Sequence, residues 1–394
     1  MKLLQFGKID KKYFIPIFDG IIMIIYQIFM KFFPKTHITE KNPFIENIYF
    51  SVGEIFAFIP YLILYNRSKN KVILDDNIND TLKESKLNVL LIYDDTIKKR
   101  RLIKYRDNLL TSIAGFLETL LYNLFTMKCV YNLWFFEIII ISFFSYILFK
   151  NKLYKHHYIS MIIIIILGFG LNVIEFFKSG NEKNKLEPFE ILMKFLEETF
   201  FCLFVIISKY NIEKNYCTPY EILTWSGVIG VILNTITLTI LNLKEYTIFD
   251  IKYPDNFFEY FSNYNIYDFI ICFMIVLISF GYHTLLILTA DHFTPFHILI
   301  TCIIEESFNY FQFKEHLALN ILGIIILIII AFIFLIFIEI IEINIFNLSY
   351  NTKQNIMERS KSENSNEAIN EIDDNGETKR EEESSNSSIS HDVM

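Results

Sequence analysis

The segment that decides the fold is Phe201–Leu241, FCLFVIISKYNIEKNYCTPYEILTWSGVIGVILNTITLTIL. It holds two apolar runs separated by a short polar stretch that contains Asn215 and Thr218. A helix needs about 20 apolar residues to cross the hydrocarbon core of a bilayer. Pro219 opens the second run, in the first turn of a helix, where the missing N–H of proline costs little. The segment therefore predicts two membrane helices joined by a tight turn.

A weaker copy of this segment lies near the N-terminus, between Tyr26 and Leu64. The two copies share, in the same order, a lysine, a proline, a glutamate and a glycine: Lys31 and Lys209, Pro43 and Pro219, Glu46 and Glu221, Gly53 and Gly227. A Phe-Lys pair also follows an apolar run further along each half, at Phe149-Lys150 and Phe313-Lys314. These matches predict two related halves. Chance similarity in a chain so rich in Ile and Phe is the alternative.

The composition places the chain among membrane proteins. It has 394 residues, of which 53% are hydrophobic, and it contains long apolar runs such as Phe135–Leu148 and Ile321–Ile338. Because these runs are continuous rather than alternating, they indicate membrane helices and not the strands of a β-barrel. The net charge of −8 lies largely in the C-terminal region and says little about a substrate.

The sequence predicts an all-α polytopic membrane protein with about ten transmembrane helices, arranged as two inverted five-helix repeats. The predicted spans are 13–33, 45–65, 106–127, 131–149, 158–177, 190–209, 219–242, 266–289, 292–312 and 317–342. Lys and Arg are concentrated in the segments that this count places with the N-terminus, so the positive-inside rule predicts that both termini are cytosolic. The membrane itself, endomembrane or plasma membrane, stays open.

The predicted organisation has four parts. Residues 1–12 form a cytosolic N-terminal tail, and 13–177 form the first five-helix half, with a cytosolic loop at 66–104. Residues 190–342 form the second half. Residues 351–394 are rich in Glu, Ser and Asn and are expected to be a disordered cytosolic tail, because they cannot bury enough apolar surface to offset the entropy of ordering.

An odd number of spans in each half means that the second half enters the membrane from the opposite side. Such inverted repeats place a cavity near the membrane midplane, and rocking of one half against the other gives alternating access. The architecture therefore predicts a secondary carrier of a small organic metabolite, with no covalent chemistry and hence no enzyme activity. Neither a cofactor nor a metal is expected.

The ten spans, the Lys-turn-Pro-aromatic-Glu junctions and the Phe-Lys pairs together resemble the drug/metabolite transporter superfamily, and within it the EamA-like and solute-carrier-35-like branches. The resemblance covers about residues 13–342 and rests mainly on architecture. It implies a carrier of small metabolites, for which nucleotide sugars or drug-like solutes are candidates. The sequence shows no residue signature that selects a substrate.

Polar side chains deep in the spans are the candidates for a substrate path. A charged group in the hydrocarbon core costs at least about 2.5 kcal/mol, so the charges that a membrane protein retains there should face its interior. The candidate residues are Glu54, Glu118, Tyr122, Asn123, His283, Glu305, Glu306 and Asn309.

Two other classes of function compete with the carrier. An integral-membrane transferase would need a reactive cluster near the interface, and His156-His157 and Asp291-His292 are the weak candidates for one. A channel would need a filter loop or a ring of charges, and neither is visible. The expected partners are the lipid bilayer and a small-molecule substrate. No nucleic acid is expected, and the sequence is compatible with a homodimer.

Overall fold

This computed structural model describes residues 4–6, 11–32, 43–74, 95–126, 129, 132–179, 188–242, 247–248, 251–252, 266–311 and 316–343. The predictions for 351–394, for Phe313-Lys314 and for the centre of the 66–104 loop lie outside this part of the chain. Contacts divide the chain into two units. One unit comprises 9–153 and 161–334, and the other comprises 1–8, 154–160 and 335–394.

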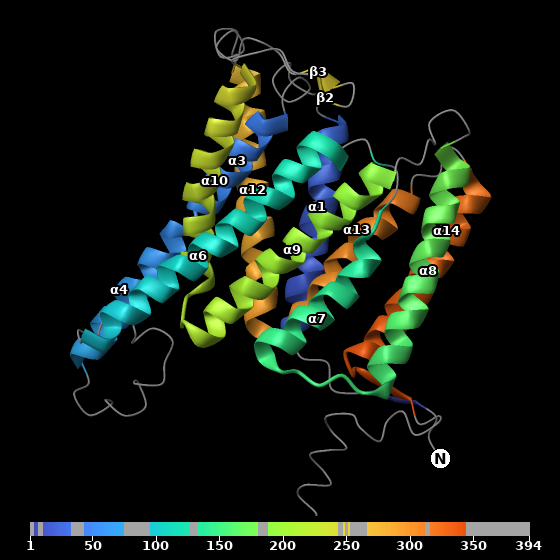
Figure 1. Cartoon of the computed structure of the whole chain (residues 1–394), viewed down its shortest axis with the longest axis horizontal. Helices are drawn as coiled ribbons and strands as arrows, with labels where there is room; N and C mark the ends of the chain where they lie inside the picture. The colour runs from blue at the N-terminus through green and yellow to red at the C-terminus, as the bar shows by residue number, and fades with distance from the viewer. Residues whose placement is uncertain are drawn as a thin grey trace, which may run out of the picture. The chain divides into compact units, whose positions relative to one another are not determined.

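The described part of the chain is built almost entirely of helices (Figure 1). The helices are α1 (Phe14–Phe32), α3 (Pro43–Ile55), α4 (Phe58–Leu74), α6 (Asp95–Leu121), α7 (Glu137–Phe149), α8 (Lys155–Ser179), α9 (Pro188–Lys214), α10 (Pro219–Asn242), α12 (Ile266–His292), α13 (Ile298–Tyr310) and α14 (Leu317–Phe337). Two short antiparallel strand pairs join β1 (Leu4–Phe6) to β4 (Ile341–Ile343) and β2 (Thr247–Ile248) to β3 (Ile251–Lys252).

Within the described residues, seven helical segments are long and apolar enough to cross a membrane. They are Lys11–Phe29, Phe44–Asn66, Lys104–Thr126, Lys155–Lys178, Pro219–Leu241, Ile266–His292 and Leu317–Phe337. The chain is therefore a multi-pass α-helical membrane protein. Each of the ten predicted spans overlaps a described helix, or two helices in the case of 45–65, but α7 and α13 are shorter than the seven, and α9 carries buried charges.

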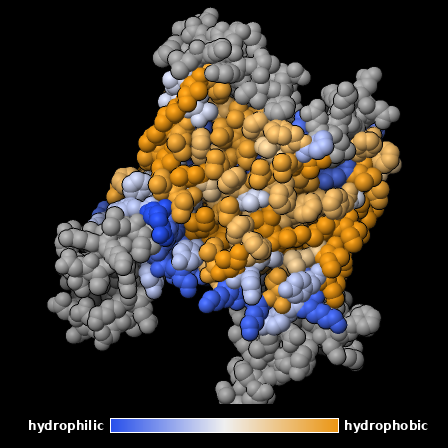
Figure 2. Space-filling model, viewed as in Figure 1, coloured by the Kyte–Doolittle hydropathy of each residue, from blue (hydrophilic) through white to orange (hydrophobic). Residues whose placement is uncertain are grey.

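The outer surface of the helices carries the apolar residues that a bilayer requires. Figure 2 shows hydrophobic side chains over most of the face in view. On α8, exposed apolar residues recur at the spacing of one helix face: Ile162, Ile166, Phe169, Val173 and Phe177. A stripe of this width on a helix whose other faces are packed is typical of contact with lipid.

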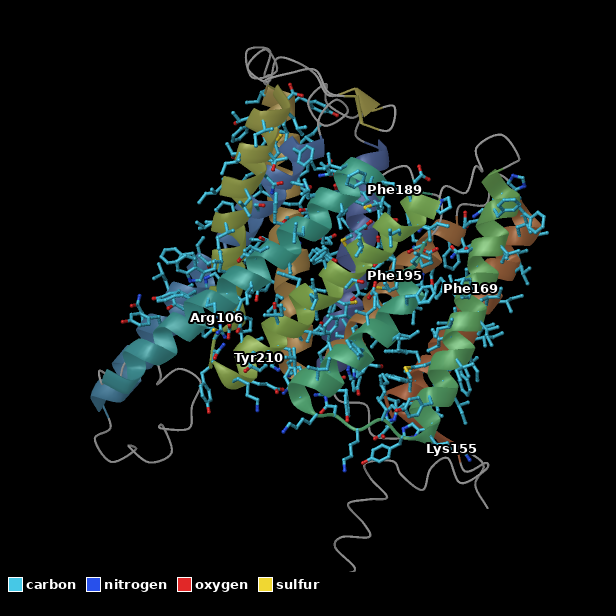
Figure 3. The ribbon with its side chains drawn as sticks, viewed as in Figure 1. Arg106, Lys155, Phe169, Phe189, Phe195 and Tyr210 are labelled. Atoms are coloured by element: carbon cyan, nitrogen blue, oxygen red, sulfur yellow. The ribbon has the colours of Figure 1, made fainter. Side chains whose placement is uncertain are left out.

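Aromatic side chains pack α8 against the short 3₁₀ turn that precedes α7, and the same turn against α9. The Phe169 ring lies 5.2 Å from the Phe135 ring and 5.6 Å from the Phe136 ring, and Phe136 in turn lies 5.9 Å from Phe195. Figure 3 labels Phe169 and Phe195, the two ends of this chain of contacts. Edge-to-face pairs at these separations add to the energy of apolar burial.

The predicted span 45–65 is not one continuous helix. The structure breaks it at Phe56 and Ala57, between α3 and α4. Pro60 explains the break, because proline donates no N–H to the carbonyl four residues earlier and its ring collides with that carbonyl. The Phe56 carbonyl instead accepts a bond from the Ile59 N–H at 3.0 Å. The 66–104 loop is also shorter than predicted, since α4 continues to Leu74 and α6 begins at Asp95.

The predicted turn between α9 and α10 is confirmed, since α9 ends at Lys214 and α10 begins at Pro219. Amide groups of α9 hold this turn to α6. Asn211 Nδ2 donates to Asn108 Oδ1 at 3.2 Å, and Asn215 Nδ2 donates to Asp107 Oδ2 at 2.9 Å. The Cys217 thiol is fully enclosed at this turn, and burial raises its pKa to about 12.

Candidate functional site

A cavity of about 510 Å³ lies within the larger unit. Its lining residues come from α1, α3, α6, α9, α10, α12 and α13, from the beginning of α7 and from the segment Tyr122–Thr126 that follows α6. No described residue of α8 or α14 lines it. The cavity is therefore enclosed by membrane helices from both halves of the sequence, which Figure 1 shows side by side.

The structure brings all eight candidate residues together in the lining of this cavity. α3 supplies Glu54, and α12 supplies His283. The end of α6 and the segment that follows it supply Glu118, Tyr122 and Asn123. α13 supplies Glu305, Glu306 and Asn309. Side chains separated by up to 255 residues in the sequence thus share one cavity, from Glu54 to Asn309. That they bind a substrate stays a prediction.

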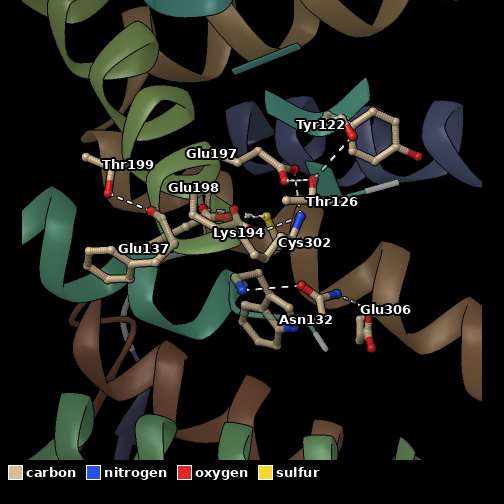
Figure 4. Close-up of polar contacts among 12 residues, drawn as sticks. Tyr122, Thr126, Asn132, Glu137, Lys194, Glu197, Glu198, Thr199, Cys302 and Glu306 are labelled. Carbon is tan, nitrogen blue, oxygen red and sulfur yellow. Dashed lines mark hydrogen bonds and ion pairs between the residues drawn. The ribbon is translucent and has the colours of Figure 1, made fainter. Parts of the chain in front are cut away.

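A charged cluster on α9 forms one wall (Figure 4). The Lys194 ammonium lies 2.6 Å from Glu197 Oε1 and 3.1 Å from Glu198 Oε1. The Thr126 hydroxyl donates a hydrogen bond to the second carboxylate oxygen of Glu197. Lys194 therefore has both of its nearest acids within contact distance, and its charge is already compensated by the protein.

Glu137, at the start of α7, extends this cluster. The Cys302 thiol points toward its carboxyl group and lies 3.8 Å from both of its oxygens. Glu137 is only 2% exposed, so this acid is enclosed by the protein.

The adjacent acids Glu305 and Glu306 contact different neighbours across the cavity. Gln27 Nε2 of α1 donates to Glu305 at 2.8 Å. Glu306 accepts from Asn132 Nδ2 at 2.9 Å and from Asn309 Nδ2 at 3.2 Å. All three donors are neutral amides, so these bonds leave the acidic character of both side chains uncompensated.

His283 and Glu54 connect α12 to α3. His283 Nδ1 lies 3.3 Å from Glu54 Oε1 and 3.1 Å from the Ser279 hydroxyl oxygen. Ser279 donates its own hydrogen to the Phe50 carbonyl at 2.8 Å. Because that proton is used, the Ser279 oxygen can only accept from His283, which places a proton on Nδ1. The imidazole N–H therefore faces the Glu54 carboxyl group.

Sequence reasoning did not select several residues that the structure places in the cavity. Lys194, Glu197 and Glu198 stand three and four residues apart, the spacing that puts side chains on one face of a helix. That spacing was a usable signal for a clustered site. Glu137 was missed because it stands near the beginning of an apolar run, where an acidic side chain is expected to lie in water at the end of a membrane helix. Asp19 of α1, which is not among the lining residues, was also missed, and the structure buries it completely beside the Thr301 hydroxyl, which donates at 3.1 Å.

A second group of titratable side chains lies in the smaller unit. His156 Nε2 lies 3.1 Å from Glu339 Oε1, and His157 Nε2 lies 3.9 Å from the same atom. Ligand atoms of the three residues lie within 4.8 Å of one another, close enough to hold one metal ion. The Tyr154 N–H, however, donates to His157 Nδ1 at 3.0 Å. A neutral ring that accepts at Nδ1 carries its proton on Nε2. The Nε2 proton of His157 therefore faces the Glu339 carboxylate, and in this arrangement Nε2 has no lone pair to offer to a metal ion.

In comparisons with known proteins, no family model matches the chain, and no curated protein gives a significant match.

Proposed function

We propose that the chain is a secondary transporter that carries a small organic solute by alternating access, with ten membrane helices in two inverted halves as in the drug/metabolite transporter superfamily. The observation that carries this proposal is the cavity of about 510 Å³, which both halves of the chain enclose and which ionisable side chains line. Ionisable groups inside membrane helices are costly, and they mark substrate or ion pathways.

The lining of the cavity divides evenly between the proposed halves. The helices of the first half, in order, are α1, α3 with α4, α6, α7 and α8, and those of the second are α9, α10, α12, α13 and α14. In each half the first four helices contribute lining residues, and the fifth contributes none among the described residues. Two copies of one fold around a central site would produce this division.

Helix packing supports the same correspondence. α1 packs against α12 and α13, and its counterpart α9 packs against α6 and α7. α3 packs against α12, and its counterpart α10 packs against α6. α3 and α10, which correspond to each other, are in direct contact. Swapping each helix for its counterpart in the other half turns each of these contacts into a contact of the same set, as a pseudo-two-fold axis requires.

Local details repeat as well. The fourth helix of each half has 13 residues and follows a three-residue 3₁₀ turn, Trp134–Phe136 before α7 and Pro295–His297 before α13. The fifth helix of each half places a glycine against an aromatic ring of the fourth segment. A Cβ atom on Gly168 would overlap Phe135, and one on Gly323 would overlap Tyr310.

The pairing of the chain ends bears on the number of crossings. β1 precedes the first membrane helix and β4 follows the last, and the two strands pair in an antiparallel register, Leu4 with Ile343 and Phe6 with Ile341. Paired strands lie on one side of the membrane, which requires an even number of crossings between them. Seven is odd, and we infer that α7, α9 and α13 supply the three further crossings, which gives ten. We infer that both termini lie on the same side, the cytosolic one by the distribution of Lys and Arg.

Uptake into liposomes that contain the purified full-length protein tests the proposal. We expect saturable uptake of at least one solute from a panel of amines, amino acids, sugars and nucleotide sugars. Replacing both Glu305 and Glu306 with Gln should reduce that uptake about tenfold or more, because a hydrogen bond to a charged group contributes about 1.5–3 kcal/mol. Glu213→Gln is the matched control, since that side chain is 41% exposed and lies outside the cavity. Absence of uptake across the panel would contradict the carrier.

A membrane enzyme that acts at the interface is the second candidate, and the cluster of His156, His157 and Glu339 is the observation that favours it. Such an enzyme would turn over its substrate in detergent, where no gradient exists. His156→Ala and His157→Ala would then abolish turnover. A carrier predicts instead that both variants retain uptake.

A further inference from the structure

Acidic side chains around the cavity far outnumber basic ones. Eight glutamate side chains line it, and they are Glu46, Glu54, Glu118, Glu137, Glu197, Glu198, Glu305 and Glu306. Lys194 is the only lysine or arginine among the described lining residues. Charges within a few ångströms interact more strongly here than in water, because the surrounding protein and lipid have a low effective dielectric constant.

The basic side chains of the lining, Lys194 and His283, already have partners. Lys194 contacts Glu197 and Glu198 at 2.6 and 3.1 Å. The His283 ring lies against Glu54 and Ser279. A phosphate or carboxylate that entered the cavity would therefore meet no cation without displacing an internal acid, and it would lie close to several other acids.

The lining holds two hydrogen-bond acceptors, Asn234 Oδ1 and the Glu118 carboxyl group, to which the described residues supply no donor. The Asn234 amide nitrogen donates to the Gly230 carbonyl at 2.9 Å, which fixes the orientation of the amide and leaves its Oδ1 without a donor. Asn234 is only 2% exposed, so bulk water does not satisfy that oxygen. The Glu118 carboxyl group lies on the cavity wall and accepts no hydrogen bond from the described residues. Buried acceptors of this kind need an N–H or O–H donor from a ligand or from ordered water.

The lining also holds one donor without an acceptor, Asn47 Nδ2, and several aromatic rings that include Tyr26, Phe50 and Trp134. A donor suits an oxygen of the ligand, and aromatic faces attract cations. A cavity of about 510 Å³ accommodates a small organic molecule, since ligand pockets commonly measure about 300–1,000 Å³.

We propose that the solute carried through this cavity is an organic cation with a protonated amine, and that Glu118 and the Asn234 carbonyl accept hydrogen bonds from its N–H groups. The assignment rests on the proposed transport function. It separates this chain from a carrier of nucleotide sugars or other phosphorylated metabolites, which would need free positive charge where the structure has acids.

A matched set of probes isolates the charge. Phenethylamine, phenethyl alcohol and phenylacetate share one ring and differ in the end group, which is cationic, neutral or anionic near neutral pH. Putrescine and uridine diphosphate glucose extend the cationic and the anionic arms. Binding to the purified full-length protein in detergent and uptake into proteoliposomes are measured for each probe, with protein-free liposomes to correct for passive entry.

We expect saturable binding and uptake of an amine, with the alcohol and the anions at least about tenfold weaker, as loss of one hydrogen bond to a charged group implies. Glu118→Gln and Asn234→Leu should each weaken amine binding about tenfold, whereas Glu213→Gln should leave it unchanged. Melting temperatures of the purified variants check that the fold is intact, and a variant that binds weakly while melting normally supports a direct contact.

The two readouts separate the cation assignment from transport. Preferential uptake of phenylacetate or of uridine diphosphate glucose would overturn the assignment and leave the carrier in place. Binding of an amine with no uptake of any probe would support the assignment and contradict transport. Failure of both amines to bind would overturn the assignment whatever the uptake data show.

Discussion

Replacing Lys194 with Met should destabilise the protein strongly. The ammonium group lies 2.6 Å from one glutamate and 3.1 Å from the other, and the three side chains are only 14%, 7% and 10% exposed. Removing one partner from a buried charge cluster typically costs about 3–5 kcal/mol, because the remaining charges lose their compensation. Methionine keeps the length and most of the apolar stem, so packing changes little. We therefore expect a loss of about 3–5 kcal/mol in the free energy of unfolding.

Equilibrium unfolding in mixed micelles of a mild detergent and dodecyl sulfate measures this loss. The triple variant Lys194→Met, Glu197→Gln, Glu198→Gln removes the two uncompensated acids together with the lysine, and it should recover most of the lost stability. Glu213→Gln breaks a pair in which the acid is 41% exposed, so it should cost less than about 1 kcal/mol. A loss below about 1 kcal/mol for Lys194→Met, or no recovery in the triple variant, would refute the packing of Lys194 between its two acids.

Three further predictions concern packing, the α9–α10 turn and topology. Gly168→Val should cost about 1–3 kcal/mol of stability because the new side chain collides with the neighbouring phenylalanine. Gly170→Ala is the control, since its Cβ would lie at an ordinary 3.7 Å from the nearest neighbour. Equal stability of the two variants would contradict the packing. The Cys217 thiol, with a pKa raised to about 12 by burial, should stay protonated and unreactive toward maleimide up to about pH 10, and rapid labelling at pH 8 would be inconsistent with its enclosure. Epitope tags inserted at Asp76 and Lys183 should be accessible from opposite sides of the membrane, and detection of both from one side would rule out the proposed order of crossings.

The location of the helices was largely predictable from the sequence. Long apolar runs have few stable solutions in a bilayer other than helices, so hydropathy alone placed a helix at each predicted span. The break at Phe56 was missed although Pro60 stood in the sequence, because hydropathy does not register the loss of one hydrogen-bond donor. Strand pairing between Leu4–Phe6 and Ile341–Ile343 was not foreseen, since nothing local in two three-residue segments specifies a partner more than 300 residues away.

The candidate site was predictable in part. The cost of a charge in lipid identified Glu54 and Glu118 as inward-facing, and both line the cavity. The same argument applied to Lys194 with its two glutamates, but the charges made that segment look like a poor span rather than a wall of the site. The contact between His156 and Glu339 spans 183 positions and could not be inferred from spacing. Which of the acids a substrate contacts depends on three-dimensional neighbours, and a single sequence does not encode these in any local pattern.

Side-specific labelling tests the central claim most directly, because alternating access requires that one cavity open to each side of the membrane in turn. In a full-length variant with its five native cysteines replaced, Thr119→Cys places a thiol on the cavity wall, and Ile166→Cys places one on the lipid-facing stripe of α8 as a control. The account predicts that a membrane-impermeant thiol reagent labels the cavity cysteine from either side and labels the control from neither. Labelling of the cavity cysteine from one side alone, or from neither side, would contradict it.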